Sequence, residues 1–323
     1  MSKSNALVSV IIPCYNYADY IPETLESILA QTYTHWEAIV VDDGSVDNTA
    51  CVVADYVKLD SRIQYHYQRN QGMSAARNAG IGLARGEYIQ FLDSDDYVAA
   101  TKFEIQVGLL RSNKDADLVY SDAYNFIHEF EANTARKFRK FRLLMHPMSG
   151  QGEALALHMA SDNIFLIGSP IFKRSMAAAI GLFDKSLFSF EDWVFWYKAV
   201  LQGYKFVYDN REGTEFYVRT HGNNTTGNRY KMWKYKIQAR QSLIQIIQSM
   251  MMSNSDSSLN LKVVLAKHHS LLYEEQARFN LLFDNIGKGL INAALYSIHG
   301  EKPLRIWYDS AYWIKERLLG RAK

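Results

Sequence analysis

The sequence has few of the residues that mark several classes of protein. Only two of its 323 residues are cysteines, Cys14 and Cys51, which is too few for a disulfide framework or a CxxC metal site. We therefore expect two reduced core thiols in a cytosolic protein. Five prolines and no low-complexity tract argue against long disordered segments. No apolar run reaches about 18 residues, so no spanning helix is expected, and residues 7–14 are interpreted as a strand, not a signal peptide.

Two nucleotide-binding motifs are also absent. The sequence contains neither G-x-x-x-x-G-K-[S/T] nor G-x-G-x-x-G, so neither a P-loop nor a dinucleotide-binding fingerprint is present. The net charge of +2 gives no support to nucleic-acid binding. The charge is unevenly spread, because residues 1–230 hold 22 Lys/Arg and 27 Asp/Glu, whereas residues 231–323 hold 14 and 7, a net of +7. A basic tail on an acidic body points to an anionic surface.

Strand and helix patterns alternate over about the first 120 residues. Apolar runs of strand length alternate with segments whose apolar residues repeat at helical spacing. This order predicts βαβ units and an α/β fold with a mainly parallel sheet between helices. Strands are expected over residues 7–14, 36–42, 63–67, 87–93 and 116–120.

The alternation is lost over residues 123–162, where Arg136–Arg142 holds five bases among seven residues. We interpret this segment as a solvated loop; the alternative is a basic lip near an anionic acceptor or membrane. Residues 164–172 and 215–221 have strand-like character again, and residues 191–202 predict an aromatic helix. The pattern is helical from about residue 231, which predicts one domain over residues 1–230 and a helical C-terminal extension over residues 231–323.

Polar clusters follow three of the expected strands. The carboxyl ends of parallel strands share one edge of a sheet, where such sheets bind ligands. We therefore expect the three clusters to converge on one crevice. They are residues 13–16, Asp42 with Asp43, and Asp93, Asp95 and Asp96.

The acidic residues suggest two kinds of chemistry. Carboxylates as close as those of FLDSDDY repel one another unless a cation or a donor lies between them. A bound Mg²⁺ would relieve this repulsion, because it binds one or two protein carboxylates and completes its coordination shell with water and substrate phosphate. A capped turn is an evenly matched alternative. In VVDDGSVDN a carboxylate could accept the imide N–H of uracil or thymine, or a ribose hydroxyl, although turn and capping chemistry is the better explanation of that cluster taken alone.

Three further candidates each have a structural alternative. Arg77 would project toward the crevice and could meet a diphosphate, or it is an exposed helix residue. Glu191 and Asp192 begin a helix, where a carboxylate could take a proton from an acceptor hydroxyl or simply cap the helix. His221 enters a Gly/Asn loop and could ligate a metal or touch a diphosphate, or it is structural.

Together these segments resemble the inverting family-two glycosyltransferases with the GT-A fold. The resemblance covers about residues 7–230 and rests on VSVIIPCYNYADYIPETLESILAQTY, VVDDGSVDNT, NQGMSAARNAGIGLARGEYIQFLDSDD and the later ED pair. It implies a Rossmann-like parallel sheet flanked by helices. It also implies transfer of a sugar from a nucleotide sugar, a UDP-sugar by preference, to an acceptor hydroxyl with Mn²⁺ or Mg²⁺ as cofactor.

The resemblance also implies a role for each matching residue. Pro13 and Tyr15 would border the nucleoside, with Asp42 and Asp43 at the base, Asp95 at the ribose, Arg77 at the diphosphate and Asp93 in the same cluster. Asp96 would bind the metal, with Asp95 and His221 beside it. Asp192 would be the general base with Glu191 next to it, and Gly168 and Ser169 would shape the acceptor pocket.

One departure from the family bears on the product. The Q-x-x-R-W element and the transmembrane helices of processive synthases are absent from the sequence, which favours one sugar per event. The expected acceptor is a carbohydrate or a lipid-linked sugar of cell-surface polysaccharide or glycolipid synthesis. The C-terminal helices are expected to pack on the body or on a second subunit of a homodimer, or to contact the inner face of the cell membrane.

Two other functions could use some of the same features. A nucleotidyltransferase would use a similar sheet and metal-binding acids, but it usually needs a Gly/Lys/Arg-rich triphosphate loop, and Pro13–Tyr20 contains none. A non-catalytic nucleotide-binding scaffold with a recruiting tail would not need the retained acids.

Overall fold

The computed structural model describes residues 6–129, 137–142, 147–221, 228–253, 259–300 and 304–319. It divides into two compact units, which are described separately. The first comprises Met1–Gln151, Ile164–Lys185 and Tyr204–Asn223, and the second Gly152–Asn163, Ser186–Gly203 and Asn224–Lys323. The predicted domain boundary at residue 230 stays a prediction.

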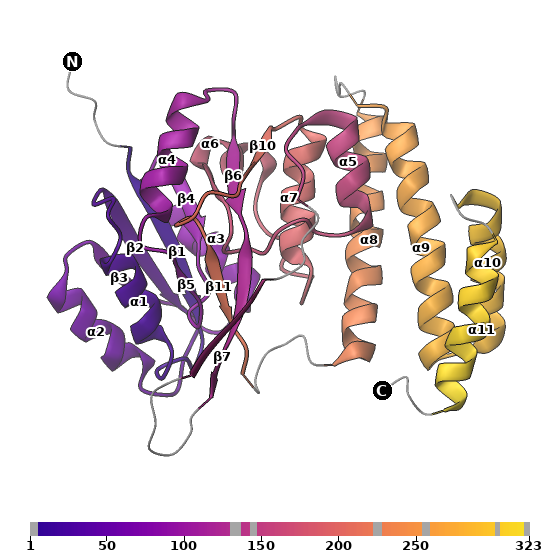
Figure 1. Ribbon diagram of the computed structural model, residues 1–323, viewed down its shortest axis with the longest axis horizontal. Helices are drawn as coiled ribbons and strands as arrows, with labels where there is room; N and C mark the ends of the chain where they lie inside the picture. Colours follow the sequence, from indigo (N-terminus) through magenta and orange to yellow (C-terminus); the bar gives the residue numbers. More distant parts are fainter. Residues whose placement is uncertain are drawn as a thin grey trace. The chain divides into compact units, whose positions relative to one another are not determined.

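A seven-stranded sheet organises the first unit (Figure 1). Its order is β10-β6-β9-β4-β1-β2-β3, and every neighbouring pair is parallel except the two that β9 makes with β4 and β6. The mainly parallel sheet predicted from the alternating pattern is thus confirmed. The strands are β1 Val8–Cys14, β2 Trp36–Asp42, β3 Ile63–Tyr67, β4 Tyr88–Phe91, β6 Leu118–Ser121, β9 Ile171–Lys173 and β10 Phe206–Asp209.

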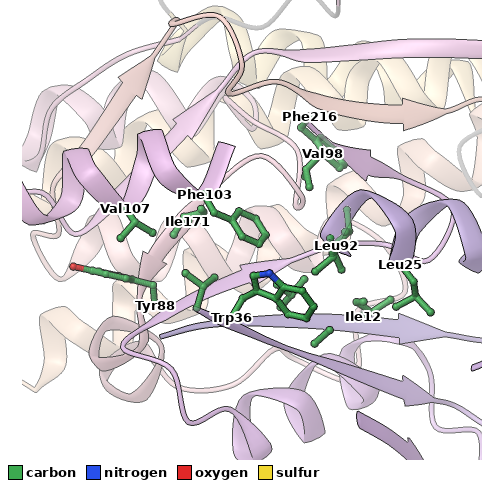
Figure 2. Packing of buried hydrophobic residues seen from close by; sticks show 14 of the residues in the cluster. Ile12, Leu25, Trp36, Tyr88, Leu92, Val98, Phe103, Val107, Ile171 and Phe216 are labelled. Carbon is green, nitrogen blue, oxygen red and sulfur yellow. The ribbon is translucent and has the colours of Figure 1, made fainter. Parts of the chain in front are cut away.

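Helices cover both faces of this sheet. Alternate residues of a strand point to opposite faces, and Val8, Val10 and Ile12 of β1 share a buried cluster with side chains of the helices α1 and α4, several of which Figure 2 shows. Ile11 points the other way, toward Gly80 of α3. The helices of this unit are α1 Ile21–Leu29, α2 Thr49–Leu59, α3 Met73–Leu83, α4 Lys102–Ser112 and α6 Arg174–Ile180.

A smaller sheet, which the sequence did not predict, lies in the same unit. Its order is β5-β11-β7-β8, from Tyr97–Val98, Phe216–Arg219, Ala123–Glu129 and Lys137–Arg142. The expected strand at residues 215–221 is therefore β11, whereas the basic segment predicted as a solvated loop is the strand β8, paired with β7. Arg136 lies outside the described residues. The strand expected over residues 164–172 is confined to β9 at its end.

The second unit is helical, as predicted for residues 231 onward. Leu243 and Ile247 of α8 are fully buried, as the apolar stripe of that helix indicates. Three of the long helices begin with an asparagine whose side chain accepts an amide of the first turn, Asn228, Asn260 and Asn285. The helices are α5 Gly152–Ser161, α7 Glu191–Leu201, α8 Arg229–Met252, α9 Leu261–Phe283, α10 Ile286–His299 and α11 Arg305–Leu318.

Two features of the structure bear on expectations from the sequence: the lengths and hydropathy of its helices, and the positions of its two cysteines. Within the described part of the chain, no helix is both long enough and apolar enough to cross a membrane. Cys14 is buried at the end of β1, but Cys51 is exposed on α2, so the prediction of two core thiols is wrong for Cys51. It lies on the solvent side of an amphipathic helix, whereas Val53 faces the core.

Candidate active site

The first two polar clusters meet where β1 and β2 end. The strands run parallel, and the backbone N–H of Asp43 donates to the carbonyl of Cys14 at 2.8 Å. Asn16 adds two bonds, since its N–H donates to Ser45 Oγ (2.9 Å) and its side-chain oxygen accepts the N–H of Val46 (2.8 Å). Asn16 has a positive φ of 57°, which asparagine tolerates better than most residues. The expected convergence of these two segments is therefore confirmed.

Asp43 organises the segment that leads into α3. Its Oδ1 accepts from Gln68 Nε2 (2.6 Å) and the N–H of Gln71 (2.9 Å), and its Oδ2 accepts the N–H of Gly72 (2.7 Å). An ionised carboxylate has about four acceptor sites. Asp43 can therefore hold this segment and still accept one more donor, such as the N–H of a base.

Asp42 supports the turn itself. It is buried, its Oδ1 accepts the N–H of Ser45 (2.8 Å), and its Oδ2 accepts the hydroxyl of Tyr65 (2.6 Å). Burial, followed by this hydrogen bond, raises the pKa of Tyr65. The contacts of Asp42 thus lie within the protein, and its predicted contact with the nucleotide stays a prediction.

Of the two residues predicted to border the nucleoside, one has an accessible side chain. Tyr15 is 42% exposed just beyond β1. Pro13 is buried within the strand, opposite Val41. Tyr15 can therefore meet a ligand directly, whereas Pro13 shapes the strand end.

The acidic turn after β4 is the third cluster, and each of its aspartates has a partner from elsewhere in the chain. Arg77 of α3, which pairs with Asp93, is nearly buried, so water has little access to its guanidinium. The turn also contacts β1 directly, because the N–H of Leu92 donates to the carbonyl of Ile11 at 3.0 Å. The pairs are Arg77 Nη2 with Asp93 Oδ1 (2.9 Å), His221 Nε2 with Asp95 Oδ2 (2.9 Å), and the N–H of Arg219 with Asp96 Oδ1 (2.9 Å).

Burial and mutual repulsion oppose ionisation of this cluster. Burial is the main cause that raises the pKa of Asp96 well above its usual range, and the carboxylates of Asp95 and Asp93 add to it. Burial and Asp93 also raise the pKa of Asp95, although His221 partly offsets this. Buried like charges are stabilised when a cation lies among them. Bound protons or a bound cation would therefore stabilise this cluster.

The donor set fits a cation that the protein only partly encloses. Among the residues the structure describes, no three His, Cys, Asp or Glu side chains form a metal cage. Mg²⁺ and Mn²⁺ suit carboxylate and water ligands, and Mg²⁺ commonly uses only one or two protein carboxylates. Asp96 Oδ1 accepts a backbone N–H, so its Oδ2 is the oxygen best suited to a cation.

An aromatic pair that the sequence reasoning missed supports His221. The imidazole stacks on Tyr20 with ring centroids 4.9 Å apart and meets Tyr17 edge-on at 5.9 Å. Burial and the nearby aspartates raise the pKa of Tyr17. Both tyrosines lie in the segment YNYADY, whose aromatic spacing was a signal that could have pointed to this role.

Arg219 is the second residue that was missed. Its Nε donates to the carbonyl of Asp95 (2.8 Å) and its Nη2 pairs with Glu23 (2.6 Å), in addition to its N–H bond to Asp96. It thereby ties β11 to the acidic turn and brings His221, two residues later, against Asp95. No local pattern could reveal a contact across more than 120 residues.

Gly168 and Ser169 lie in the packed interior of the first unit. A Cβ at Gly168 would come within 2.3 Å of the Phe216 ring. Ser169 is 1% exposed and exchanges hydrogen bonds with the backbone of Ser121. These contacts indicate a packing role, so the predicted acceptor pocket receives no support at Ser169.

Glu191 and Asp192 belong to the second unit and form the first turn of α7. The residue before them, Phe190, has a φ of 62°, a rare backbone conformation for a bulky side chain. Such strain clusters at functional sites. The role of Asp192 as the general base, with Glu191 next to it, stays a prediction.

Known proteins resemble the chain in sequence and in fold. The sequence matches glycosyl transferase family 2 over residues 9–174. An uncharacterized glycosyltransferase of Rickettsia typhi is 34% identical over 203 residues, which are 59% of this chain and 58% of that protein. The matched part of the chain spans 58% of the length of that relative and between 28% and 43% of the lengths of three other curated glycosyltransferases, two from Bacillus subtilis and one from Streptococcus pneumoniae.

Two solved structures share the fold. TarS residues 1–349 of S. aureus, in complex with UDP-GlcNAc, has a TM-score of 0.65 at 18% identity and covers 97% of this chain and 90% of its own. The mannosyltransferase PcManGT of Pyrobaculum calidifontis, in complex with GDP-Man and Mn²⁺, has a TM-score of 0.56 at 16% identity, covering 99% and 88%. At these identities the likeness shows the GT-A-type α/β fold alone. Since the sequence match extends over half of the chain and includes the three polar clusters, the chain belongs to glycosyl transferase family 2.

Proposed function

We propose that this protein transfers one sugar from a UDP-sugar to an acceptor hydroxyl, with inversion at the anomeric carbon and with Mn²⁺ or Mg²⁺ at Asp96. The observation that carries the proposal is the buried acidic turn held between Arg77 and His221 at the carboxyl edge of the parallel sheet. Family membership supports sugar transfer as the reaction.

The geometry supports a nucleotide diphosphate as the donor's leaving part. Tyr15 would stack on the base, Asp43 would accept its imide N–H, and Asp95 would meet the ribose. Arg77 and His221 would face the diphosphate oxygens. TarS and PcManGT, which share the fold, were solved with UDP-GlcNAc and with GDP-Man. The carboxylate at Asp43 suits the imide N–H of uracil or thymine, and UDP is the proposed donor nucleotide.

The cation would be held by Asp96, with Asp95 and His221 beside it. When bound, it would neutralise charge that develops on the departing diphosphate. PcManGT was solved with Mn²⁺. The high pKa of Asp96, which burial causes, supports a role that requires a bound positive charge.

Asp192 would accept the proton of the acceptor hydroxyl as that oxygen bonds to the anomeric carbon. The bond from the anomeric carbon to the phosphate oxygen breaks, and the nucleoside diphosphate leaves with its electron pair. Arg77 and His221 would hold the diphosphate as it gains charge. Direct displacement inverts the anomeric centre without a covalent enzyme intermediate.

Calorimetry with UDP tests the donor site. The wild-type chain should bind UDP in the presence of Mn²⁺ and much more weakly without it. Asp96→Asn should abolish the Mn²⁺ dependence, whereas Asp115→Asn, the same change at an exposed position, should leave it intact. A folded wild-type sample that binds no UDP would favour the scaffold alternative.

Analysis of the released nucleotide distinguishes sugar transfer from nucleotidyl transfer. A thermal-shift panel of UDP-, dTDP- and GDP-sugars with Mn²⁺ selects the donor, because a ligand that binds the native state raises its melting temperature. Incubation with that donor and candidate carbohydrate or lipid-linked acceptors should release the nucleoside diphosphate. Release of pyrophosphate from a nucleoside triphosphate would instead identify a nucleotidyltransferase.

A further inference from the structure

The carboxylate of Asp192 is held by two donors within the second unit. Its Oδ1 accepts the backbone N–H of Trp193 (2.7 Å), and its Oδ2 accepts Nδ2–H of Asn163 (2.9 Å). Asn163 lies two residues beyond the end of α5. Its side-chain oxygen is buried and has no hydrogen-bond partner among the described residues. The amide therefore serves the carboxylate and does not cap its own helix.

Helix α8 holds the end of α5 that carries Asn163. Arg240 donates from Nη1 to the carbonyl of Ala160 at 2.8 Å, and Lys236, one turn earlier, lies 3.4 Å from Asp162 Oδ2. These two basic side chains share one face of α8, four residues apart. Arg240 thus holds the backbone at Ala160, and Lys236 lies beside the side chain of Asp162, the residue before Asn163.

Arg240 is itself locked in place. It is fully buried and makes a bidentate pair with Glu275 of α9, through Nε at 2.6 Å and Nη2 at 2.7 Å. His268 Nδ1 lies 3.1 Å from Nη1 of the same guanidinium. A guanidinium with this many fixed partners has one available geometry, so the carbonyl of Ala160 is held in one position.

Two side chains of helix α7 donate hydrogen bonds to backbone carbonyls of α5. Trp193 donates from Nε1 to the carbonyl of Met159 (2.9 Å), and the hydroxyl of Tyr197 donates to the carbonyl of Ala156 (2.7 Å). Both side chains are buried. The helix that carries Asp192 and the segment that carries Asn163 are thus joined at three points, all within one unit.

We propose that Asn163 is a positioning residue for Asp192, and that α8, through Arg240, holds the Asn163 segment in register with α7. The amide donor orients the carboxylate and favours its ionised form. The ionisable groups on the elements packed here include Glu191, Asp162 and Lys236, together with Arg240, Glu275 and His268. The inference rests on the proposed role of Asp192 as the base, and it makes the C-terminal helices part of the catalytic apparatus.

Carboxyl NMR on the full chain tests the positioning. With [4-¹³C]aspartate labelling, the Asp192 signal is assigned by its loss in Asp192→Asn, and its titration midpoint is followed with pH. Asn163→Asp replaces the donor by a carboxylate of the same shape and should raise that midpoint by about one pH unit or more. Asn163→Leu, which removes the donor without adding charge, should raise it less.

Asn210→Asp is the matched control, the same change at an exposed position, and should leave the Asp192 midpoint unchanged. Equal midpoints in wild type, Asn163→Asp and Asn163→Leu, in samples with wild-type melting temperature, would overturn the proposal. Arg240→Lys keeps the charge but loses donors, and it should shift the midpoint in the same direction. If Arg240→Lys does not fold, Lys236→Met tests the same helix at a less buried contact, and an unchanged midpoint there overturns the part assigned to α8.

Turnover separates this inference from the proposed function. With the donor selected by thermal shift, Asp192→Asn should lose transfer while still binding UDP and Mn²⁺. Retained transfer would remove the base role from Asp192 without altering the NMR result. Conversely, loss of transfer in Asp192→Asn, together with normal midpoints in the Asn163 variants, would refute the positioning alone.

Discussion

Asp95 and Asp96 are buried carboxylates whose nearest charged neighbours include another carboxylate, Asp93. In a folded protein this arrangement costs stability unless protons or a cation compensate for it. The high pKa of Asp96 expresses that cost. Under the proposed function this cost is offset by the cation that Asp96 binds, so removal of the carboxylate should have opposite effects on stability and on ligand binding.

Asp96→Asn should stabilise the metal-free protein and abolish Mn²⁺-dependent UDP binding. The asparagine oxygen can still accept the N–H of Arg219, so the buried charge is the main loss. Because burial and the neighbouring carboxylates make the charged form of Asp96 unfavourable, removing that charge should raise the free energy of unfolding. Urea denaturation in EDTA measures the first effect and calorimetry the second; a less stable Asp96→Asn would contradict this account.

Lys102 is a buried cation whose role is structural. Its Nζ donates to the carbonyls of Ser169 (2.7 Å) and Thr214 (3.1 Å) and to Ser121 Oγ (3.0 Å). Burial is the main cause that lowers the pKa of Lys102 from 10.5 to about 7. The side chain thus joins segments of the two sheets while losing much of its affinity for a proton.

Stability should therefore depend on pH through Lys102. Between about pH 7 and pH 10 the unfolded state holds a proton that the folded state has lost, so the free energy of unfolding rises with pH, by at most about 1 kcal/mol per pH unit. Lys102→Met should flatten this slope and lower stability overall, because carbonyls lose their donor. Denaturation at pH 7, 8 and 9 measures it. Lys58→Met, at an exposed lysine, should keep the wild-type slope.

At the scale of elements, the approach of α3 to β1 depends on one glycine. A Cβ at Gly80 would lie 2.3 Å from Ile11 Cγ2, which is closer than atoms pack. Glycine there allows the helix that carries Arg77 to lie directly on the strand whose end forms the site. The buried small residues of this helix, Ser74, Ala75, Ala76 and Gly80, are consistent with its packing on the sheet.

Gly80→Ala should destabilise the protein by about 1–3 kcal/mol, because overpacking forces backbone or side-chain shifts. Gly82→Ala is the control on the same helix. A Cβ there meets nothing within 4 Å, so this change should stabilise by about 0.5–1 kcal/mol through helix propensity. Chemical denaturation of both variants measures the pair. Equal effects of the same sign would refute the close-packing explanation.

At the scale of the whole molecule, the C-terminal helices combine basic charge with exposed apolar side chains. Residues 231–323 carry a net charge of +7. Leu304, directly before α11, and Tyr308, Tyr312 and Leu318 on α11 are all more than half exposed. Aromatic and aliphatic side chains on a helix surface, within a basic region, suit the interface of an anionic membrane.

The full chain should therefore float with phosphatidylglycerol-containing liposomes at low salt and be released at high salt, since a charge attraction is screened. Tyr308→Ser combined with Leu318→Ser should weaken flotation. Leu59→Ser, at an equally exposed leucine of the first unit, should not. Absence of flotation at low salt, or flotation insensitive to both charge and salt, would contradict the prediction.

The sequence alone determined the parallel sheet and the edge at which its chemistry lies. Apolar periodicity is local, and the carboxyl ends of neighbouring parallel strands must share one edge, so the meeting of β1, β2 and β4 could be inferred without coordinates. The position of the acidic turn at the end of β4 followed in the same way, as did the long C-terminal helices.

Only the tertiary structure decided which partners these residues have. Arg219 and His221 meet the acidic turn across more than 120 residues, Asn163 meets Asp192 across 29, and Arg240 meets Glu275 across 35. Such contacts leave no periodic trace, because each depends on how whole elements pack and not on the residues adjacent in the chain. The strand β8, where a basic loop was expected, also depends on a tertiary contact. Its pairing with β7 satisfies its backbone hydrogen bonds, and the residues adjacent in the chain do not predict that pairing.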